Sequence, residues 1–215
     1  MARFVITGTG TEIGKTVFAA GLTGLLKADY WKPVQSGLND TTDPPREGLP
    51  RPGTDAHRVA LLTGARIWPS TYVLNEPLSP HRAAEIDGVT IDPDRLTPPD
   101  ADRLVIEGAG GVLVPVTRQV LFADLFARWD LPVVLCATTG LGTISHTVSA
   151  VESLEKRGVN LHGIAFIGED NPDNIRTIAE LTGARVLGRL PLLSQVTPER
   201  LRSAMAAHFN LGDFT

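Results

Sequence analysis

The chain has 215 residues, of which 42% are hydrophobic, so it can bury one sizeable core, and a single domain over residues 1–215 is expected. Its 24 acidic residues outnumber 20 lysines and arginines for a formal net charge of -4, and neither sign forms a long run. This balance argues against nucleic acid or an anionic membrane as a partner, because both favour a basic surface.

The apolar stretch 131–137 is too short to span a bilayer, and Met1 leads within two residues into a strand-like run without a signal peptide. A cytoplasmic protein is therefore expected. The single cysteine, Cys136, lies inside this stretch, so an intrachain disulfide is impossible. A buried, unreactive thiol is the favoured interpretation.

Strand-like and helix-like segments alternate along the chain. In chain order we expect strand 3–7, helix 15–27, strand 29–34, helix 55–62, a helix starting at Ser79-Pro80, strand 104–107, helix 121–129, strand 131–137, helix 143–157, strand 162–167, helix 173–181, strand 185–187 and helix 198–209. Between them, residues 35–53 are polar and proline-rich, which favours a long mobile loop. Several strands are apolar on both faces, so the pattern predicts an α/β fold with a mostly parallel sheet and helices on both faces.

The first turn carries the clearest motif. Residues 8–16, GTGTEIGKT, lie between a strand and a helix, where backbone N–H groups and the helix dipole can receive phosphate oxygens. Lys15 is expected to bridge the β- and γ-phosphates, Thr16 to offer its hydroxyl to Mg²⁺, and Gly14 to let the backbone approach closely. The alternative is an ordinary glycine turn. The context favours a P-loop NTPase-like fold.

Five residues separate Gly8 from Gly14, one more than the usual four, so the loop has a spare position. Thr11 and Glu12 precede the phosphate cradle and are candidates for facing a second substrate. A solvated acid favoured by the helix dipole is the alternative for Glu12.

Two carboxylates are candidates for holding the metal of such a nucleotide site, since Mg²⁺ is usually held by one or two carboxylates, hydroxyls, phosphate and water. Glu107 ends an apolar strand directly before a glycine-rich turn, and a surface acid is the alternative. Asp55 opens a helix, and a simple N-cap explains it nearly as well.

A second lysine, Lys32, ends the second predicted strand, and Ser36 follows it in a turn. Both are candidates for projecting toward the γ-phosphate, where a cation stabilises developing negative charge; a solvated lysine is the alternative. The segment 139–143, TGLGT, is either a second anion site or a plain βα turn. His81 and His146 have no spacing that suggests a metal site or a triad.

Taken in order and spacing, TGTGTEIGKT, KPVQSG, the following TDA, EPLSPH, VIEGAGG and GLGTISHT resemble the dethiobiotin synthetase family over nearly the whole chain. The resemblance implies ATP- and Mg²⁺-dependent ring closure of 7,8-diaminononanoate with CO₂, through a carbamate and a carbamic-phosphoric anhydride, to give dethiobiotin, ADP and phosphate. It also implies a homodimer.

The resemblance assigns roles to named positions. Thr16, Asp55 and Glu107 are implied as Mg²⁺ ligands, and Lys15 and Lys32 as cations for the γ-phosphate and carbamate. The implied catalytic residues are Lys15, Lys32, Thr11, Glu12 and Ser36. The implied nucleotide contacts are Gly8, Thr9, Gly10, Thr11, Glu12, Ile13, Gly14, Lys15, Thr16, Val17, Gly168, Pro191 and Leu192. The implied substrate contacts are Thr11, Lys32, Ser36, Gly108, Gly142, Thr143, Ile144 and Ser145, with the last four reaching the substrate carboxylate from the partner subunit.

Two positions depart from the family pattern. Ser145 stands where relatives often have asparagine before His146. Gly168 and Ile167 stand near the strand end where many relatives place an adenine-reading asparagine. The second departure predicts relaxed base selectivity, with other nucleoside triphosphates accepted beside ATP.

Three rival functions stay open at the level of sequence. A dimerising ATPase switch of the same fold usually has an early P-loop lysine, where this chain has Thr9 and Gly10. A glutamine-dependent amidoligase needs a glutaminase domain, for which the chain length leaves no room. A nucleotide-binding regulatory module would bind nucleotide without diamine-dependent hydrolysis.

Overall fold

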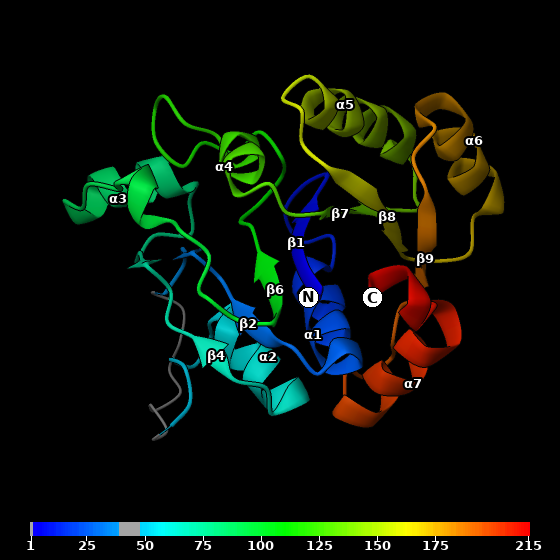
Figure 1. The fold of residues 1–215 in the computed structure, drawn as a ribbon, viewed down its shortest axis with the longest axis horizontal. Coiled ribbons are helices and arrows are strands. Elements are labelled where there is room, and N and C mark those ends of the chain that lie inside the picture. Colours follow the sequence, from blue (N-terminus) through cyan, green and yellow to red (C-terminus); the bar gives the residue numbers. More distant parts are fainter. Residues whose placement is uncertain (1, 39–47) are drawn as a thin grey trace.

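The computed structural model describes residues 2–38 and 48–215 (Figure 1). The strands are β1 (Ala2–Gly8), β2 (Asp29–Trp31), β3 (Val34–Gln35), β4 (Ile67–Trp68), β5 (Tyr72–Val73), β6 (Arg103–Glu107), β7 (Val133–Thr138), β8 (Leu161–Ile167) and β9 (Val186–Leu190). The helices are α1 (Lys15–Leu26), α2 (Asp55–Thr63), α3 (Pro80–Asp87), α4 (Phe122–Trp129), α5 (Thr143–Glu155), α6 (Pro172–Thr182) and α7 (Pro198–His208), with 3₁₀ turns η1 (Pro93–Arg95) and η2 (Leu211–Phe214). Among the described helices, none has the length and apolar character that crossing a membrane requires.

Seven strands form one parallel sheet in the order β4-β2-β6-β1-β7-β8-β9. The central strand β1 pairs with β6 on one side and β7 on the other. The loops after β1, β2 and β6 therefore leave the same edge of the sheet, next to one another. The predicted α/β fold with a mostly parallel sheet is confirmed.

Helices cover both faces of this sheet (Figure 1). Helices α1, α2 and α7 pack on one face over residues such as Ile6 and Val105, and α3 to α6 contribute to a second core on the other face over Val5 and Ile106. All four of these strand residues are fully buried. Because successive side chains of a strand point to opposite faces, burial on both faces explains the continuous apolar runs in the sequence.

The predicted strand 29–34 is wrong in its second half. Strand β2 ends at Trp31, and Val34 begins β3, which pairs with β5 in a separate two-stranded sheet. Pro33 lies between the two strands and has no N–H to donate, so the ladder cannot continue through it. Its carbonyl instead accepts bonds from Thr71 and Tyr72, which turn the chain into β5.

Four short elements, β4, β5, η1 and η2, were not predicted. Each spans two to four residues, too few for a periodic pattern to be recognised. The predicted loop 35–53 begins one residue too early, because Gln35 belongs to β3. Its central part, residues 39–47, lies outside the described residues.

Helix α2 starts differently from the N-cap interpretation of Asp55. Thr54 is the N-cap, and its side chain accepts a hydrogen bond from the His57 backbone N–H. Asp55 is the first helical residue, so its carboxylate is not used for capping. At α3, Ser79 occupies the N-cap position before Pro80, but its hydroxyl contacts the His81 ring instead of the backbone.

Candidate active site

The turn between β1 and α1 has the backbone of a phosphate-binding loop. Gly8 ends β1, and Gly14 immediately precedes α1 with a left-handed φ of 96°. A Cβ on Gly8 would lie 2.5 Å from Ile13 Cδ1 and 2.9 Å from Lys15 Cδ, so a larger residue there would force these side chains to shift. The turn thus presents the start of a 12-residue helix, a favourable position for anions.

Lys15 is buried and directed into this turn. Its ammonium donates to the carbonyl oxygen of Gly10 inside the same loop. Burial lowers the pKa of Lys15, partly offset by the nearby Glu107 carboxylate. A phosphate placed in the loop would supply the negative charge that this partly desolvated cation lacks.

The three predicted metal ligands converge from three different elements. The hydroxyl of Thr16 on α1 lies 3.0 Å from Asp55 Oδ1 at the start of α2 and 2.8 Å from Glu107 Oε1 at the end of β6. Two carboxylates and one hydroxyl form a hard oxygen set of the kind that Mg²⁺ prefers. This set has only two carboxylates, and residues 2–38 and 48–215 contain no group of three or more His, Cys, Asp or Glu side chains arranged to hold a metal ion.

Lys32 joins these carboxylates directly after β2. Its ammonium lies 2.5 Å from Asp55 Oδ2 and 3.0 Å from Glu107 Oε1. Burial alone would disfavour the ammonium, but the two carboxylates outweigh it and raise the pKa of Lys32 above its ordinary value. Lys32 also lowers the pKa of Asp55 against the effect of burial. The solvated-surface interpretation of Lys32 and of Glu107 is therefore wrong, since both side chains are almost fully buried.

Tyr30 completes this network and was missed by sequence reasoning. Its hydroxyl donates to Glu107 Oε2 at 2.7 Å, and both side chains are buried. Burial, reinforced by the carboxylate charge, raises the pKa of Tyr30 well above its usual value, so the phenol stays protonated and can donate. One feature of the sequence could have indicated Tyr30: it lies two residues before Lys32, so the two side chains are expected on the same face of the sheet.

Lys15, Thr16, Lys32, Asp55 and Glu107 line one cavity of about 830 Å³ at the carboxyl edge of the sheet, whereas Tyr30 is not on its wall. Ten predicted site residues lie on its wall: Thr11, Glu12, Gly14, Lys15, Thr16, Val17, Lys32, Ser36, Asp55 and Glu107. Glu12 is exposed, and its left-handed φ of 55° shows that this loop residue does not have a helical backbone conformation. The Ser36 hydroxyl is buried and has no hydrogen-bond partner within the described part of the chain.

Several other residues that line this cavity were not predicted. Pro77, Leu78, Pro80, Ala109 and Val114 give it an apolar side. Gln35 and Arg58 add polar groups beside Asp55. Gln35 is buried, and its side-chain oxygen accepts a hydrogen bond from the Asp55 backbone N–H at 3.1 Å.

Other predicted residues lie away from the cavity wall. Gly8, Thr9, Gly10 and Ile13 form the loop behind it, and Gly108 packs against Phe126. Gly168, after β8, and Pro191 and Leu192, after β9, lie at the neighbouring strand ends. A Cβ at Gly168 would lie 2.4 Å from Thr139 Oγ1, and its φ of 144° also disfavours a side chain.

The start of α5 is separate from this cavity as well. Gly142 and Ser145 are exposed, and Leu141 beside them is fully exposed, whereas Ile144 is half-buried. Thr143 is buried, and its hydroxyl donates to the Thr138 carbonyl. Its side chain therefore holds α5 to the end of β7.

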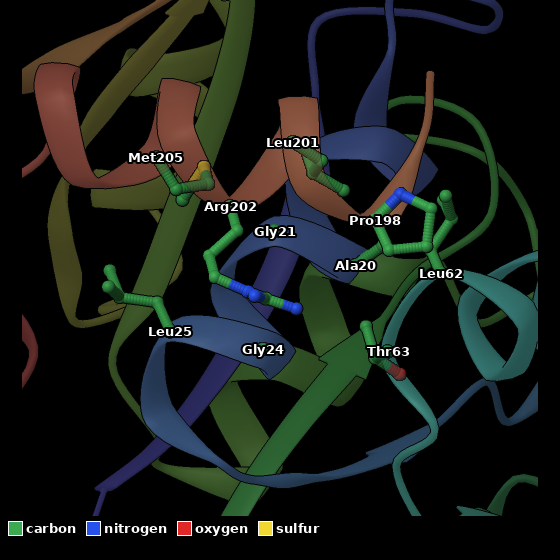
Figure 2. Close-up of a pocket in the computed structure, with 10 residues that line it drawn as sticks. All are labelled: Ala20, Gly21, Gly24, Leu25, Leu62, Thr63, Pro198, Leu201, Arg202 and Met205. Carbon is green, nitrogen blue, oxygen red and sulfur yellow. The ribbon is translucent and has the colours of Figure 1, made fainter.

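A smaller pocket of about 120 Å³ lies between α1, α2 and α7 (Figure 2). Gly21 and Gly24 form its floor, with Leu62, Leu201 and Met205 around it and Arg202 across its opening. Arg202 is its one ionisable lining residue, and none of the site residues described above contributes to it. This pocket is a packing feature of three helices.

Comparison with known proteins agrees with this geometry. A family model described as an AAA domain matches residues 2–200. The chain is 56% identical to ATP-dependent dethiobiotin synthetase BioD of Afipia carboxidovorans, over 99% of this chain and 98% of that protein. It is 53% identical to the protein of the same name from Agrobacterium fabrum, over 99% and 96%. The chain belongs to the ATP-dependent dethiobiotin synthetase family. The predicted family and the class of enzyme are thereby confirmed.

Solved structures support the fold of this dethiobiotin synthetase family member. A ParA family ATPase from Chlorobium tepidum superposes with a TM-score of 0.51 at 12% identity, covering 98% of this chain and 92% of that one. The cell division ATPase MinD of Pyrococcus furiosus gives 0.52 at 14% identity, covering 89% and 84%. At such identities the likeness shows the P-loop NTPase fold alone.

Proposed function

We propose that this chain, as a single domain, catalyses ATP-dependent ring closure of 7,8-diaminononanoate with CO₂ to give dethiobiotin, ADP and phosphate. One observation carries the proposal. Two lysines, two carboxylates and a hydroxyl converge beside a phosphate-binding turn, on the wall of a cavity with an apolar side. They come from α1, α2, β6 and the segment after β2. Membership of the family gives the substrate class.

The nucleotide is proposed to bind with its phosphates along residues 8–16. Backbone N–H groups and the start of α1 face the phosphate oxygens, and Lys15 turns from the Gly10 carbonyl to the β- and γ-phosphates. Thr16, Asp55 and Glu107 would hold Mg²⁺, which supplies neutralisation of charge on the β- and γ-phosphate oxygens. The Thr16 hydroxyl lies 3.0 Å from Asp55 Oδ1 and 2.8 Å from Glu107 Oε1, which supports this ligand set.

The diamine is proposed to lie between the loop and the apolar wall. Its alkyl chain matches Pro77, Leu78 and Val114, which line the same cavity as the two lysines. The Ser36 hydroxyl, which is buried and has no hydrogen-bond partner among the described residues, supplies a polar contact, because a buried polar group left unpaired is costly. Thr11 and Glu12, at the spare loop position, face the same space.

The reaction needs positioned charges and no side-chain nucleophile. An amine of the diamine adds to CO₂ and releases a proton, giving a carbamate. A carbamate oxygen then attacks the γ-phosphorus, and ADP leaves. The second amine attacks the carbonyl carbon of the resulting anhydride, loses a proton and expels phosphate, which closes the cyclic urea. The Lys32 ammonium stabilises negative charge on the carbamate and on the transferred phosphoryl group, and Lys15 does so on the nucleotide side.

A homodimer is part of the proposal. Gly142, Thr143, Ile144 and Ser145 lie outside the cavity, so the start of α5 would meet the substrate carboxylate only from a second copy of the chain. The exposed Leu141 and Ser145 leave this helix start open to such a contact. A cytoplasmic location is also proposed; the one cysteine is a buried free thiol, which fits a reducing compartment.

Relaxed base selectivity completes the proposal. Gly168 offers no side chain to read the base, and the neighbouring Thr139 leaves no space for one. Pro191 and Leu192 would line the base through apolar contact, which discriminates poorly between bases.

The proposal is tested by following ¹⁴C-bicarbonate and phosphate in parallel in mixtures that lack ATP, diamine or bicarbonate in turn. We expect acid-stable ¹⁴C product and phosphate in equal amounts, and only in the complete mixture. Phosphate release that is indifferent to the diamine would favour the ATPase-switch alternative. Nucleotide binding without phosphate release would favour the regulatory module.

A further inference from the structure

The two oxygens of the Glu107 carboxylate have different partners. Oε1 accepts from the Thr16 hydroxyl at 2.8 Å and from the Lys32 ammonium at 3.0 Å. Oε2 accepts from the Tyr30 hydroxyl at 2.7 Å. One oxygen therefore faces the site and the other faces a phenol in the core.

The sheet explains why Tyr30 reaches Glu107. Strands β2 and β6 are parallel neighbours, and Tyr30 is paired in register with Val105. Glu107 lies two residues beyond Val105, on the same face of the sheet, and Lys32 lies two residues beyond Tyr30. A long aromatic side chain leaning along its strand spans this diagonal, so its hydroxyl meets the carboxylate at the strand end.

The geometry points to Tyr30 as a positioning residue that holds the Glu107 carboxylate with Oε1 turned toward Thr16 and the metal site. The inference rests on the proposed role of Glu107 as a metal ligand. A carboxylate can rotate about its last bond, and the phenol fixes that rotation by binding one oxygen. Groups that orient a metal ligand in this way typically change metal affinity by 10- to 100-fold when they are removed.

The buried Tyr30 hydroxyl has a role that packing of the ring alone does not explain. The Tyr30 ring is fully buried among residues under α1, and a phenylalanine would fill the same space. The Tyr30 hydroxyl is the group that contacts a site residue, through its hydrogen bond to Glu107. Its loss leaves Oε2 without its one protein donor in the described structure, at a position that is 1% exposed. The carboxylate then gains by turning Oε2 toward Lys32 or Thr16.

Tyr30→Phe removes only the hydroxyl that the inference concerns, and Tyr72→Phe is the matched control. Tyr72 is also buried, and its hydroxyl accepts a hydrogen bond from the Asp92 backbone N–H at 2.9 Å. Like Tyr30 it does not line the cavity, but its printed hydrogen-bond partner is not one of the proposed metal ligands. Binding of Mn²⁺ to the full chain with saturating ADP is measured by electron paramagnetic resonance. We expect about 10- to 100-fold weaker binding for Tyr30→Phe and less than about twofold change for Tyr72→Phe.

Thr16→Val and Asp55→Asn separate this inference from the proposed metal site. If the wild type binds no Mn²⁺ with ADP, or if these two variants bind it normally, the metal site itself is wrong. If both variants lose binding while Tyr30→Phe keeps wild-type affinity, the site stands and the role of Tyr30 is overturned. A crystal structure of the wild type with ADP and Mn²⁺ gives a test that needs no variant. Tyr30 must remain bonded to Oε2 with the ion on Oε1, and an ion held by both oxygens would overturn the inference.

Discussion

The Lys32 ammonium lies 3.0 Å from Glu107 Oε1, although 75 residues separate the two along the chain. One follows β2 and the other ends β6, and these strands are neighbours in the sheet. Their side chains are almost fully buried, so the pair is shielded from water and is electrostatically strong. The same ammonium bonds Asp55, which means that one cation organises both carboxylates of the site.

Replacing Lys32 by methionine should harm both catalysis and stability. The variant leaves Asp55 and Glu107 facing each other without their cation, and breaking a buried pair typically costs about 3–5 kcal/mol. We expect at least a hundredfold loss of diamine-dependent phosphate release. Denaturant unfolding at pH 7 measures the stability change. Unchanged stability would show that the pair is not formed in solution.

Lys15→Ala should abolish phosphate release while the fold is retained. Lys15 is the cation of the phosphate-binding turn, and its loss removes charge stabilisation worth about 10³-fold or more in such sites. Single-turnover phosphate release measures the effect. Lys156→Ala, at an exposed lysine after α5, serves as the control and should be unaffected. If the activity of Lys15→Ala stays within tenfold of the wild type, the nucleotide does not bind at this turn.

Base selectivity should be weak. Sites that hydrogen-bond a substrate group reject analogues lacking it by about 10⁴–10⁵, whereas apolar contact discriminates by about 10² or less. We therefore expect kcat/KM values for ATP, CTP and GTP within about a hundredfold of one another. Gly168→Asn should not restore selectivity, because its Cβ would clash with Thr139. A strong, exclusive preference for ATP in the wild type would contradict this account.

The helix pocket gives a matched pair of stability tests (Figure 2). A Cβ on Gly21 would lie 2.6 Å from Met205 Cγ, so Gly21→Ala should destabilise by about 1–3 kcal/mol through overpacking. A Cβ on Gly24 has its nearest atom at 3.9 Å, so Gly24→Ala should stabilise by about 0.4–1 kcal/mol by restricting the unfolded chain. Thermal unfolding of both variants measures the difference, and equal effects would show that α7 does not pack as described.

Acid stability should depend on Glu85. Bonds from Arg118 and Arg82 lower the pKa of Glu85 from 4.5 to about 2. Because the folded pKa is the lower one, the ion pair stabilises the protein above pH 4.5 and is lost as the pH falls toward 2. Glu85→Gln should flatten this part of the stability profile, and Glu152→Gln, at an exposed acid on α5, should not. Parallel profiles for both variants would contradict the pairing.

A mostly parallel sheet and the phosphate-binding turn could be predicted from the sequence because long apolar runs and glycine spacing are local signals. Strand β7 and helix α5 follow from their own residues. Pro33 ended β2 early, and β4 and β5 are two residues each, so their pairing depends on tertiary contacts. In the site, the positions of Glu107 and Lys32 at strand ends were enough to identify them. That the Glu107 carboxylate contacts both Tyr30 and Lys32 could be predicted only by knowing that β2 adjoins β6. The apolar wall at Pro77 and Val114 likewise comes from loops whose path no periodicity predicts.

The most direct test of the central claim is a crystal structure of the wild type with Mg²⁺, a non-hydrolysable ATP analogue and 7,8-diaminononanoate. The account predicts the triphosphate along residues 8–16, with the γ-phosphate in contact with the ammonium groups of both Lys15 and Lys32 and the diamine beside Ser36. A triphosphate bound elsewhere, or Lys32 and Glu107 turned away from it, would contradict the account.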